Sequence, residues 1–352
     1  SPIAYPALGR DIKVDIAIVG GGLVGITVAH LLGQANLTVA VIEANRVGGG
    51  TTGHTTGKVT SQHSFIYSKL ISNFGREKAQ QYAEANQSVI TFLEGLIKKN
   101  KIDCDFSSQA AYIYTQQDQY VKQIEEEVKA ATSLGIEAHY LEDIPLPLEV
   151  KAAERFDNQA QFHPGKFLTA LASIVAGEGG QIFEQTRAVD FQEGNPFTII
   201  TGAGYKVLAD QVIFATHFPV YDGGGLFFTR AYADRSYALT IMAKETFPGG
   251  MYLSAGPPGR SLRSTPHNGG ELIIVVGEHH RTGQGPPTGD YYRHLLQFAE
   301  DTFTVTGIPF RWSAQDYITV DEVPYAGRID QRNDNVYVAT GFRKWGITNG
   351  VV

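Results

Sequence analysis

The feature that most constrains this 352-residue chain is a glycine triplet near its start, Gly20-x-Gly22-x-x-Gly25. A short β-branched run at 14–19 precedes the triplet, and residues 26–34 follow it with the spacing of a helix. In this context Gly20 permits a tight turn, Gly22 lets the backbone approach a pyrophosphate, and Gly25 allows the helix and strand to pack closely. The free N–H groups that begin the helix would then face the phosphates. The triplet therefore predicts a dinucleotide-binding strand–turn–helix unit.

A second predicted strand, residues 37–43, ends at Glu43, whose carboxylate is placed to accept the ribose hydroxyls. These features fit either NAD or FAD, and two later strands favour FAD. An apolar run ends in Ala215-Thr216, and another run at 336–340 is followed by Gly341. We expect both strands to bring the chain back to the nucleotide-binding site, which a simple NAD-binding domain does not require. The sequence has no second strand–GxGxxG–helix unit, which excludes a pyridine-nucleotide disulfide reductase.

Composition excludes several classes of protein. Cys104 is the single cysteine, so the chain cannot form an internal disulfide, a CxxC redox pair or a cysteine-ligated metal site. The net charge of −7 and the lack of a basic stripe argue against nucleic-acid binding. The sequence has no apolar run of the ~18–20 residues that span a membrane, and no secretory signal at its start. We therefore expect a cytoplasmic protein without a membrane span.

The rest of the chain alternates helical and strand patterns. We expect adjacent residues His279 and His280 to point to opposite faces of a strand, so they cannot chelate together, and we predict no metal in the chain. The predicted helices span residues 67–99, 118–134, 167–176 and 291–303, and the predicted strands span residues 110–114, 207–215 and 336–340.

Motifs along essentially the whole chain resemble one family, the FAD-dependent oxidoreductases similar to D-amino-acid oxidase, glycine oxidase and sarcosine oxidase. The resemblance implies an α/β fold with a Rossmann-like FAD-binding domain and a second, sheet-rich substrate domain. It places the FAD-binding domain at 1–100, 150–222 and 310–352, and the substrate domain at 101–149 and 223–309. Besides the glycine triplet and Glu43, the motifs are Gly48–His54, His163-Pro164, Thr186–Val189, Trp312–Asp321, Pro324–Gly327 and Gly341–Gly350.

Two of these stretches, 50–63 and 341–350, resemble a subgroup that often carries a C-terminal Rieske iron–sulfur domain. A Rieske centre needs two Cys and two His ligands, which this chain does not supply. We therefore expect a 2Fe-2S centre only if a Rieske domain follows Val352. The family also runs a helix after Gly350 toward the flavin, so we suspect that the chain is truncated.

The resemblance also implies which residues contact FAD. The loop after Glu43 would line the pyrophosphate and the ring, and the backbone of Val189 would contact the adenine. A matching histidine in dimethylglycine-oxidising relatives is joined covalently to the flavin; for His54 we favour a hydrogen bond near the ring and keep the covalent link as the alternative. The full predicted set is Gly20, Gly22, Leu23, Val24, Gly25, Glu43, Ala44, Arg46, Gly50, Thr51, Thr52, His54, Val189, Ala215, Thr216, Gly341, Lys344, Trp345, Gly346, Ile347 and Thr348.

The resemblance nominates three catalytic residues. Arg263 would grip a substrate carboxylate, because a guanidinium suits a two-point grip, although a structural ion pair is an equal alternative. Arg230, Arg235 and Tyr237 are other candidates for that grip. Lys344 would hydrogen-bond near flavin N5 or assist oxygen activation, with Arg343 adding charge; a surface loop is the alternative. His63 would face the open side of the ring, or be a buried, hydrogen-bonded histidine.

The expected activity is FAD-dependent oxidation of a small amine or amino acid by hydride transfer to flavin N5. This chemistry needs no strong protein base, but it needs an oriented substrate and a dry pocket. Electrons would leave to oxygen or to an iron–sulfur protein or domain. Two alternatives are a dehydrogenase of another substrate that feeds a Rieske-type centre outside this chain, and a flavin-binding redox sensor without turnover.

Overall fold

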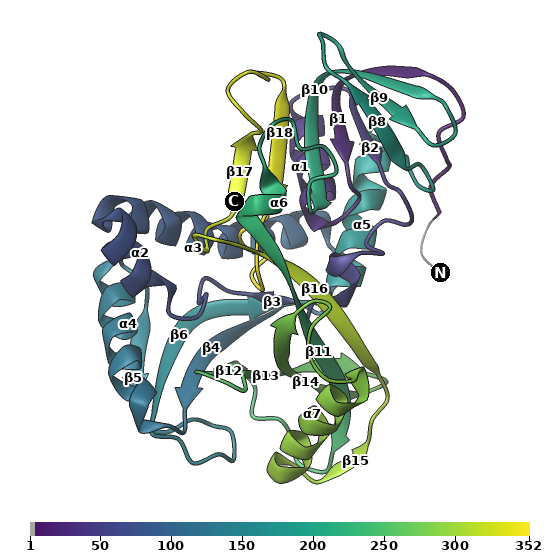
Figure 1. Ribbon diagram of the computed structural model, residues 1–352. Helices are drawn as coiled ribbons and strands as arrows, with labels where there is room; N and C mark the ends of the chain where they lie inside the picture. Colours follow the sequence, from purple (N-terminus) through teal and green to yellow (C-terminus); the bar gives the residue numbers. More distant parts are fainter. Residues whose placement is uncertain (1–3) are drawn as a thin grey trace.

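Two β-sheets organise the chain, and Figure 1 shows them one above the other. The computed structural model describes residues 4–352. The upper sheet has eight strands, and its central strands run parallel. Its order is β17 (Tyr325–Arg328), β18 (Val336–Thr340), β10 (Lys206–His217), β1 (Ile12–Val19), β2 (Val39–Ile42) and β7 (Gln181–Phe183), with β9 (Phe197–Thr201) pairing with β10 and β8 (Ala188–Gln192) pairing with β9.

The upper sheet is buried on both faces, which explains the unbroken apolar runs of its inner strands. Ile16 and Ile18 of β1 pack into a cluster with α1 (Leu23–Gln34) and α5 (Pro164–Gly177). Ala17 and Val19, one residue along, point into a second cluster on the opposite face. Because β1 pairs in parallel with both β10 and β2, the carboxyl ends of these strands meet at one edge of the sheet.

The lower sheet has ten strands, and helix α7 (Thr288–Thr302) packs against it. This sheet supplies a broad face that is turned toward the upper sheet's carboxyl edge, as the cavity described below shows. Its order is β15 (Val305–Gly307), β11 (Ala231–Ala243), β14 (Gly270–Arg281), β13 (Arg260–His267), β12 (Met251–Ser254), β4 (Ser107–Thr115), β6 (Ala152–Gln161) and β3 (Lys58–Val59), with β16 (Arg311–Thr319) on β11 and β5 (Ala138–Leu141) on β6.

The prediction of one continuous helix over residues 67–99 is wrong, because the helical region is interrupted. The structure has two helices, α2 (Ile66–Phe74) and α3 (Arg76–Asn100), separated by Gly75. Gly75 has a φ of +81°, which ends one helix and redirects the chain into the next. The remaining short helices are α4 (Val121–Ser133), α6 (Phe227–Arg230) and the 3₁₀ turns η1 (Thr51–His54) and η2 (Asp118–Tyr120). Among residues 4–352, no helix is long and apolar enough to cross a membrane.

The sheet pairing differs from the predicted domain boundaries at three strands. β3 lies in the segment 1–100, which we assigned to the FAD-binding domain, but it pairs with β6 in the lower sheet. β6 lies in the segment 150–222, which we assigned to the FAD-binding domain, but it pairs with β4 in the lower sheet. β16 lies in the segment 310–352 and pairs with β11, also in the lower sheet. Long-range pairing decides which sheet a strand joins, and strand composition does not reveal it.

Candidate active site

The glycine turn between β1 and α1 leaves no room for side chains. Gly20 has a φ of +114°, and a Cβ there would lie 2.5 Å from the carbonyl oxygen of Ala215 at the end of β10. A Cβ on Gly25 would lie 1.9 Å from the carbonyl oxygen of Gly20. The turn is therefore held against the end of β10, the strand that the sequence predicts to return to the nucleotide.

Glu43 follows β2 and closes the turn from the other side. Its Oε2 accepts a hydrogen bond from the backbone N–H of Gly21 at 2.7 Å. The Thr52 hydroxyl accepts the N–H of Leu23 at 3.0 Å, which ties the glycine- and threonine-rich loop to the start of α1. Three segments that are distant in sequence thus converge on one helix N-terminus.

A cavity of about 930 Å³ extends from this turn to the face of the lower sheet. Most of the residues predicted to bind FAD line it, so the structure brings them together although they come from five separate segments. Those that line it are Gly20, Gly22, Leu23, Val24, Glu43, Ala44, Gly50, Thr51, Thr52, His54, Ala215, Thr216, Lys344, Trp345, Gly346 and Ile347.

Five residues of the predicted FAD set do not line the cavity. Gly25 packs against the turn, as its predicted role requires, and Gly341 is a tight bend, where a Cβ would lie 2.3 Å from Thr319. Arg46 approaches Glu184, with Nη1 3.6 Å from the carboxylate. Thr348 is buried and donates to the carbonyl of Thr60 at 3.0 Å. The fifth is Val189.

Val189 sits at an irregularity of β8 and has an exposed side chain. Its neighbours Ala188 and Asp190 pair with β9, but the register skips Val189. Arg187 and Ala188 line the cavity just before it. A backbone contact from Val189 to the adenine stays a prediction, and the break in the ladder is compatible with it.

The opposite wall of the cavity is the face of the lower sheet, where alternate residues of each strand point inward. From β11 these include Asp234 and Ser236, and from β16 they include Ala314 and Asp316. Asp234 and Asp316 stand directly opposite each other across the two strands, and both are buried. Like charges in this position repel each other.

Lys344 offsets that repulsion. Its Nζ lies 3.0 Å from Asp234, 2.9 Å from Asp316 and 3.1 Å from the hydroxyl of Ser236. The predicted surface-loop alternative for Lys344 therefore does not fit. Two carboxylates share one ammonium here, so this wall of the cavity, which we call the acidic wall (Asp234, Asp316 and Lys344), carries one net negative charge.

His279 of β14 also lines the cavity, with Nδ1 3.8 Å from Asp234. Burial, reinforced by the charge of Lys344, lowers the pKa of His279 to about 4, so its imidazole is neutral at pH 7. Its neighbour His280 stacks instead on Tyr291, with ring centroids 4.5 Å apart. The two histidines therefore do not form a joint metal site.

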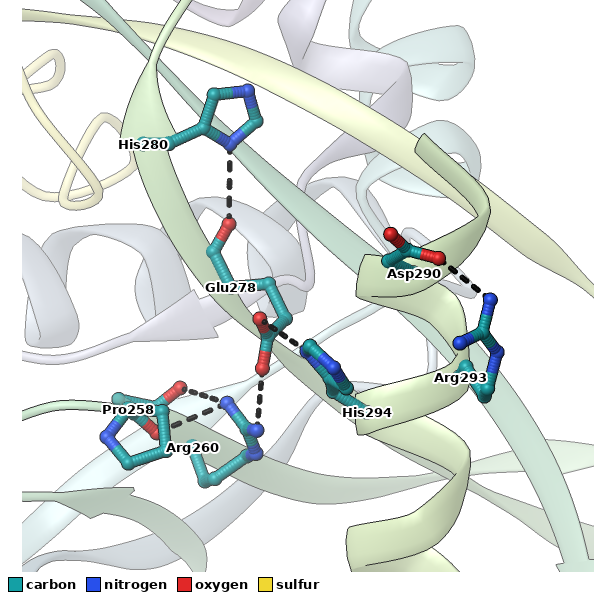
Figure 2. A network of polar contacts seen from close by, with 8 residues as sticks. Pro258, Arg260, Glu278, His280, Asp290, Arg293 and His294 are labelled. Atoms are coloured by element: carbon teal, nitrogen blue, oxygen red, sulfur yellow. Dashed lines mark hydrogen bonds and ion pairs between the residues drawn. The ribbon is translucent and has the colours of Figure 1, made fainter. Parts of the chain in front are cut away.

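Glu278 lines the cavity too, but its carboxylate is already engaged. Figure 2 shows it between Arg260 and His294, with His294 Nδ1 3.1 Å away. Arg260 also donates to the carbonyl of Pro258 at 3.0 Å. Glu278 thus belongs to a structural network, which leaves Asp234 and Asp316 as the acids of the lower sheet that face the cavity's interior.

The other two residues nominated as catalytic lie outside the cavity lining. His63 is buried, and its ring nitrogens contact Tyr82 Oη at 2.6 Å and Thr348 Oγ1 at 2.9 Å. Burial lowers the pKa of His63 to about 3. This geometry matches the buried, hydrogen-bonded histidine that the sequence left as the alternative.

Arg263 lies in β13 behind the cavity and is 4% exposed. Its guanidinium donates to the carbonyls of Ser264 at 3.2 Å and Phe162 at 3.5 Å. Within residues 4–352 Arg263 forms no ion pair, and it does not line the cavity, so neither predicted role fits its position. Among the other candidates for the carboxylate grip, Tyr237 lines the cavity, while Arg230 and Arg235 do not.

His54 lies on η1 with its side chain exposed at the cavity. Its Nδ1 is 2.8 Å from the carbonyl of Gly50, and its own carbonyl accepts a hydrogen bond from Trp312 at 2.9 Å. The covalent and non-covalent predictions for His54 both stay open to test.

Sequence reasoning predicted Lys344 but missed the two acids of the acidic wall, Asp234 and Asp316, and one further lysine, Lys58. Asp316 lies inside the Trp312–Asp321 motif, and the signal available was an acidic residue that alternates along the strand with Trp312, Ala314 and Ile318. Asp234 had the same signal in β11. Lys58 was visible only as part of the 50–63 stretch, and nothing local marks it as facing a cavity.

Comparison with known proteins identifies the family. A model of the family described as "DAO: FAD dependent oxidoreductase" matches residues 15–352. The chain belongs to this family. It is 44% identical over 349 residues to YhfW of Bacillus subtilis (strain 168), named as a Rieske 2Fe-2S iron–sulfur protein; the match covers 99% of this chain and 69% of YhfW. It is 22% identical to the gamma-glutamylputrescine oxidoreductase of Escherichia coli (strain K12), over 98% of this chain and 82% of that protein.

Similar solved structures confirm the two-domain α/β fold. Glycine oxidase from Geobacillus kaustophilus superposes with a TM-score of 0.78 at 18% identity, covering 96% of this chain and 92% of that one. L-proline dehydrogenase from P. horikoshii gives 0.77 at 23% identity, covering 97% and 91%. The turn also fits a dinucleotide such as FAD, because a Cβ on Gly20 would collide with the Ala215 carbonyl, so glycine is required for the tight turn.

Proposed function

We propose that this FAD-dependent oxidoreductase oxidises a small amine or amino acid at the carbon next to nitrogen. The observation that carries the proposal is the acidic wall across the cavity from the dinucleotide turn. One net negative charge in a partly buried site attracts a cationic nitrogen and disfavours an anion there. FAD, when bound, would supply the two-electron acceptor at flavin N5.

The chain's own residues would orient the substrate. Asp234 and Asp316 are held in place by Lys344, so they can bind an ammonium without rearranging. The imidazole of His279, beside Asp234, is neutral at pH 7 and so adds no positive charge that would repel an ammonium.

Flavin reduction tests the proposal directly. We expect the purified protein to show a yellow flavin spectrum that amines or amino acids bleach without oxygen. A panel of alcohols and hydroxy acids of matched size serves as the control and should leave the spectrum unchanged. A colourless protein after loading with FAD, or a flavin that no amine or amino acid reduces, would contradict the proposal.

The similarity to YhfW favours one second candidate, a dehydrogenase that passes electrons to a Rieske-type centre outside this chain. Reoxidation of the reduced protein separates the two. Fast reoxidation by air supports an oxidase, whereas slow reoxidation by air with fast reoxidation by an iron–sulfur acceptor supports the dehydrogenase. A flavin that no substrate of either class reduces would leave the redox-sensor alternative.

We also propose that FAD is held without a covalent bond to His54. The imidazole already has a hydrogen-bond partner in the carbonyl of Gly50. Mass spectrometry of the denatured protein should give the mass of the polypeptide alone. A mass increased by one FAD, and lost in His54→Ala, would show the covalent link instead.

A further inference from the structure

Lys58 of β3 lines the cavity among neutral groups. Its Nζ donates to the backbone carbonyl of Tyr252 at 2.9 Å and to the hydroxyl of Ser261 at 2.6 Å. Its partner across the strands, Gln161 of β6, is also uncharged. Within residues 4–352, no carboxylate oxygen lies within 4.0 Å of this nitrogen. These neighbours therefore do not stabilise Lys58 in its charged form.

The hydrogen bonds of Lys58 match those of a neutral amine. An ammonium has three N–H donors and no lone pair, whereas a neutral amine has two N–H donors and one lone pair. The Tyr252 carbonyl and the Ser261 hydroxyl accept two donors, which is the number that a neutral amine offers. The remaining tetrahedral position then belongs to the lone pair, and the cavity is the open side of this nitrogen.

Arg263 makes the charged form of Lys58 less favourable still. Its Nη2 is 3.1 Å from the position that a Cβ would take on Gly57, the residue before Lys58. The acid near Arg263 is Asp105, which Lys166 occupies with its Nζ 2.9 Å away. Burial and the charge of Arg263 lower the pKa of Lys58 to about 7. A desolvated lysine beside a second cation is an arrangement that activates the amine as a nucleophile toward carbonyl compounds.

We propose that Lys58 is a nucleophile that forms an imine with a small carbonyl compound in the cavity. The nitrogen adds to the carbonyl carbon, and the carbonyl oxygen leaves as water with the two N–H protons of the amine. Ser261 can relay one of these protons, because its hydroxyl accepts a hydrogen bond from Nζ and its own proton is free for the departing oxygen. A C=N bond replaces the C=O bond, and no oxidant or reductant is consumed.

The chemical class of the carbonyl compound follows from the proposed function. Oxidation of an amine next to nitrogen gives an imine, which water converts to an aldehyde or a ketone. This product would form in the same cavity that Lys58 lines. The link between Lys58 and turnover therefore rests on the proposed function, whereas the reactivity of Lys58 rests on its own surroundings.

Reductive trapping tests the reactivity without turnover. The FAD-loaded protein is incubated at pH 7 with propanal and cyanoborohydride, which reduces an imine to a stable secondary amine. Peptide mass spectrometry then locates the added propyl group. We expect Lys58 to be labelled at least about ten times faster than Lys13, an exposed residue of β1, because a lysine in water is almost fully charged at this pH. Propanol in place of propanal is the control and should add no mass.

The pH dependence of labelling identifies the reactive form. For an amine with a pKa of about 7, the labelling rate should rise about tenfold between pH 6 and pH 8 and then level off. For a lysine in water the rate should rise about a hundredfold over the same range and continue to rise.

Two matched substitutions accompany the wild-type measurement. Lys58→Arg keeps the positive charge but cannot form the imine, so the fast label should disappear. Lys13→Arg should leave labelling of Lys58 unchanged. Circular dichroism and the flavin spectrum show whether each variant folds and retains FAD. Because the label is mapped in the wild type, the test does not depend on the folding of a variant.

Three results would overturn the inference: propyl groups on exposed lysines alone, equal labelling of the wild type and Lys58→Arg, or a hundredfold rise in Lys58 labelling between pH 6 and pH 8. Fast trapping at Lys58 without oxidation of any amine would support the nucleophile and reject the proposed function. Oxidation of amines by a protein whose Lys58 is not labelled would do the reverse.

Discussion

His63 lies beneath the C-terminal loop, where its ring stacks on Trp345 with centroids 5.1 Å apart. It also joins the loop to the segment 60–63, through contacts to Thr348 Oγ1 at 2.9 Å and to the Thr60 carbonyl at 2.8 Å. At the scale of one residue, the sequence could show that a histidine stands near the flavin loop. It could not show that both ring nitrogens are occupied, because three separate segments supply the partners.

Substituting His63 should change how stability depends on pH. The pKa of His63 is lowered to about 3 in the folded protein. Between pH 6.5 and pH 3, His63 therefore binds a proton in the unfolded chain but stays neutral in the folded one. The free energy of unfolding therefore falls as the pH drops through this range. In His63→Gln this contribution is absent, so the variant, though less stable at pH 7, should lose less stability between pH 7 and pH 4. Urea unfolding of both proteins at pH 7 and at pH 4 measures this loss of stability.

The matched control for that experiment is His267→Gln, at a partly exposed histidine of β13 that forms no ion pair within residues 4–352. Its change in stability between pH 7 and pH 4 should follow that of the wild type more closely than the change in His63→Gln does. Parallel curves for wild type and His63→Gln would contradict the buried, neutral assignment of His63.

At the scale of elements, local units were predictable and their neighbours were not. The β1–α1–β2 unit was predicted because its glycine spacing, apolar strands and terminal Glu43 are all contiguous in sequence. The break between α2 and α3 was missed because Gly75 is a single residue in a helical pattern, and only its positive φ shows the break. The acidic wall was missed because it forms only when β11, β16 and the Lys344 loop come together.

The start of α1 allows a clean comparison between two of its glycines. Gly25→Val should abolish FAD binding, because even a Cβ would collide with the Gly20 carbonyl at 1.9 Å and displace the turn. Gly33→Ala, on the same helix with open space around it, should retain FAD. The ratio of flavin absorbance to protein concentration after gel filtration measures how much FAD each variant retains. Equal occupancy in the two variants would mean that this turn does not hold the cofactor.

Lys344→Met should expose the repulsion between the paired strands. Without the ammonium, Asp234 and Asp316 oppose each other across β11 and β16, so we expect a loss of about 1–3 kcal/mol in unfolding free energy at pH 8. The repulsion raises the carboxyl pKa in the folded variant, so the loss should shrink as the pH falls toward 5 and a carboxyl becomes protonated. Chemical denaturation at both pH values measures this.

The double variant Lys344→Met with Asp234→Asn is the control for the charge argument. Removing one of the opposed carboxylates should recover part of the stability at pH 8. A double variant that is no more stable than Lys344→Met would show that packing of the lysine stem matters more than its charge.

At the scale of the whole molecule, the cavity joins the two sheets, and both contribute residues to it. A cofactor that binds only the folded chain stabilises it by mass action, by about 2.7 kcal/mol at a hundred times its dissociation constant. We therefore expect added FAD to raise the melting temperature of the apoprotein in one transition that includes both sheets. The Gly25→Val variant should show no shift, and an equal shift in both proteins would mean that FAD binds elsewhere.

The domain boundaries were the least predictable property at this scale. β6 and β16 have ordinary strand patterns, and each pairs with a strand of the lower sheet that is distant in the chain. The family resemblance predicted the two-domain architecture, which the solved structures confirm. The sequence of β6 or β16 alone does not indicate which strand it pairs with.

The order of strands in the upper sheet has a consequence for synthesis on the ribosome. β10 pairs with β1 on one side and with β18 on the other, and the segment 218–335 separates β10 from β18 along the chain. The edge of β10 that faces β18 therefore emerges first and stays, with unpaired N–H and C=O groups, until that segment and β18 have been translated. An unpaired apolar edge of this kind invites pairing with other chains. Chaperone dependence during expression should thus follow the length of chain between β10 and β18, more than the stability of the finished protein.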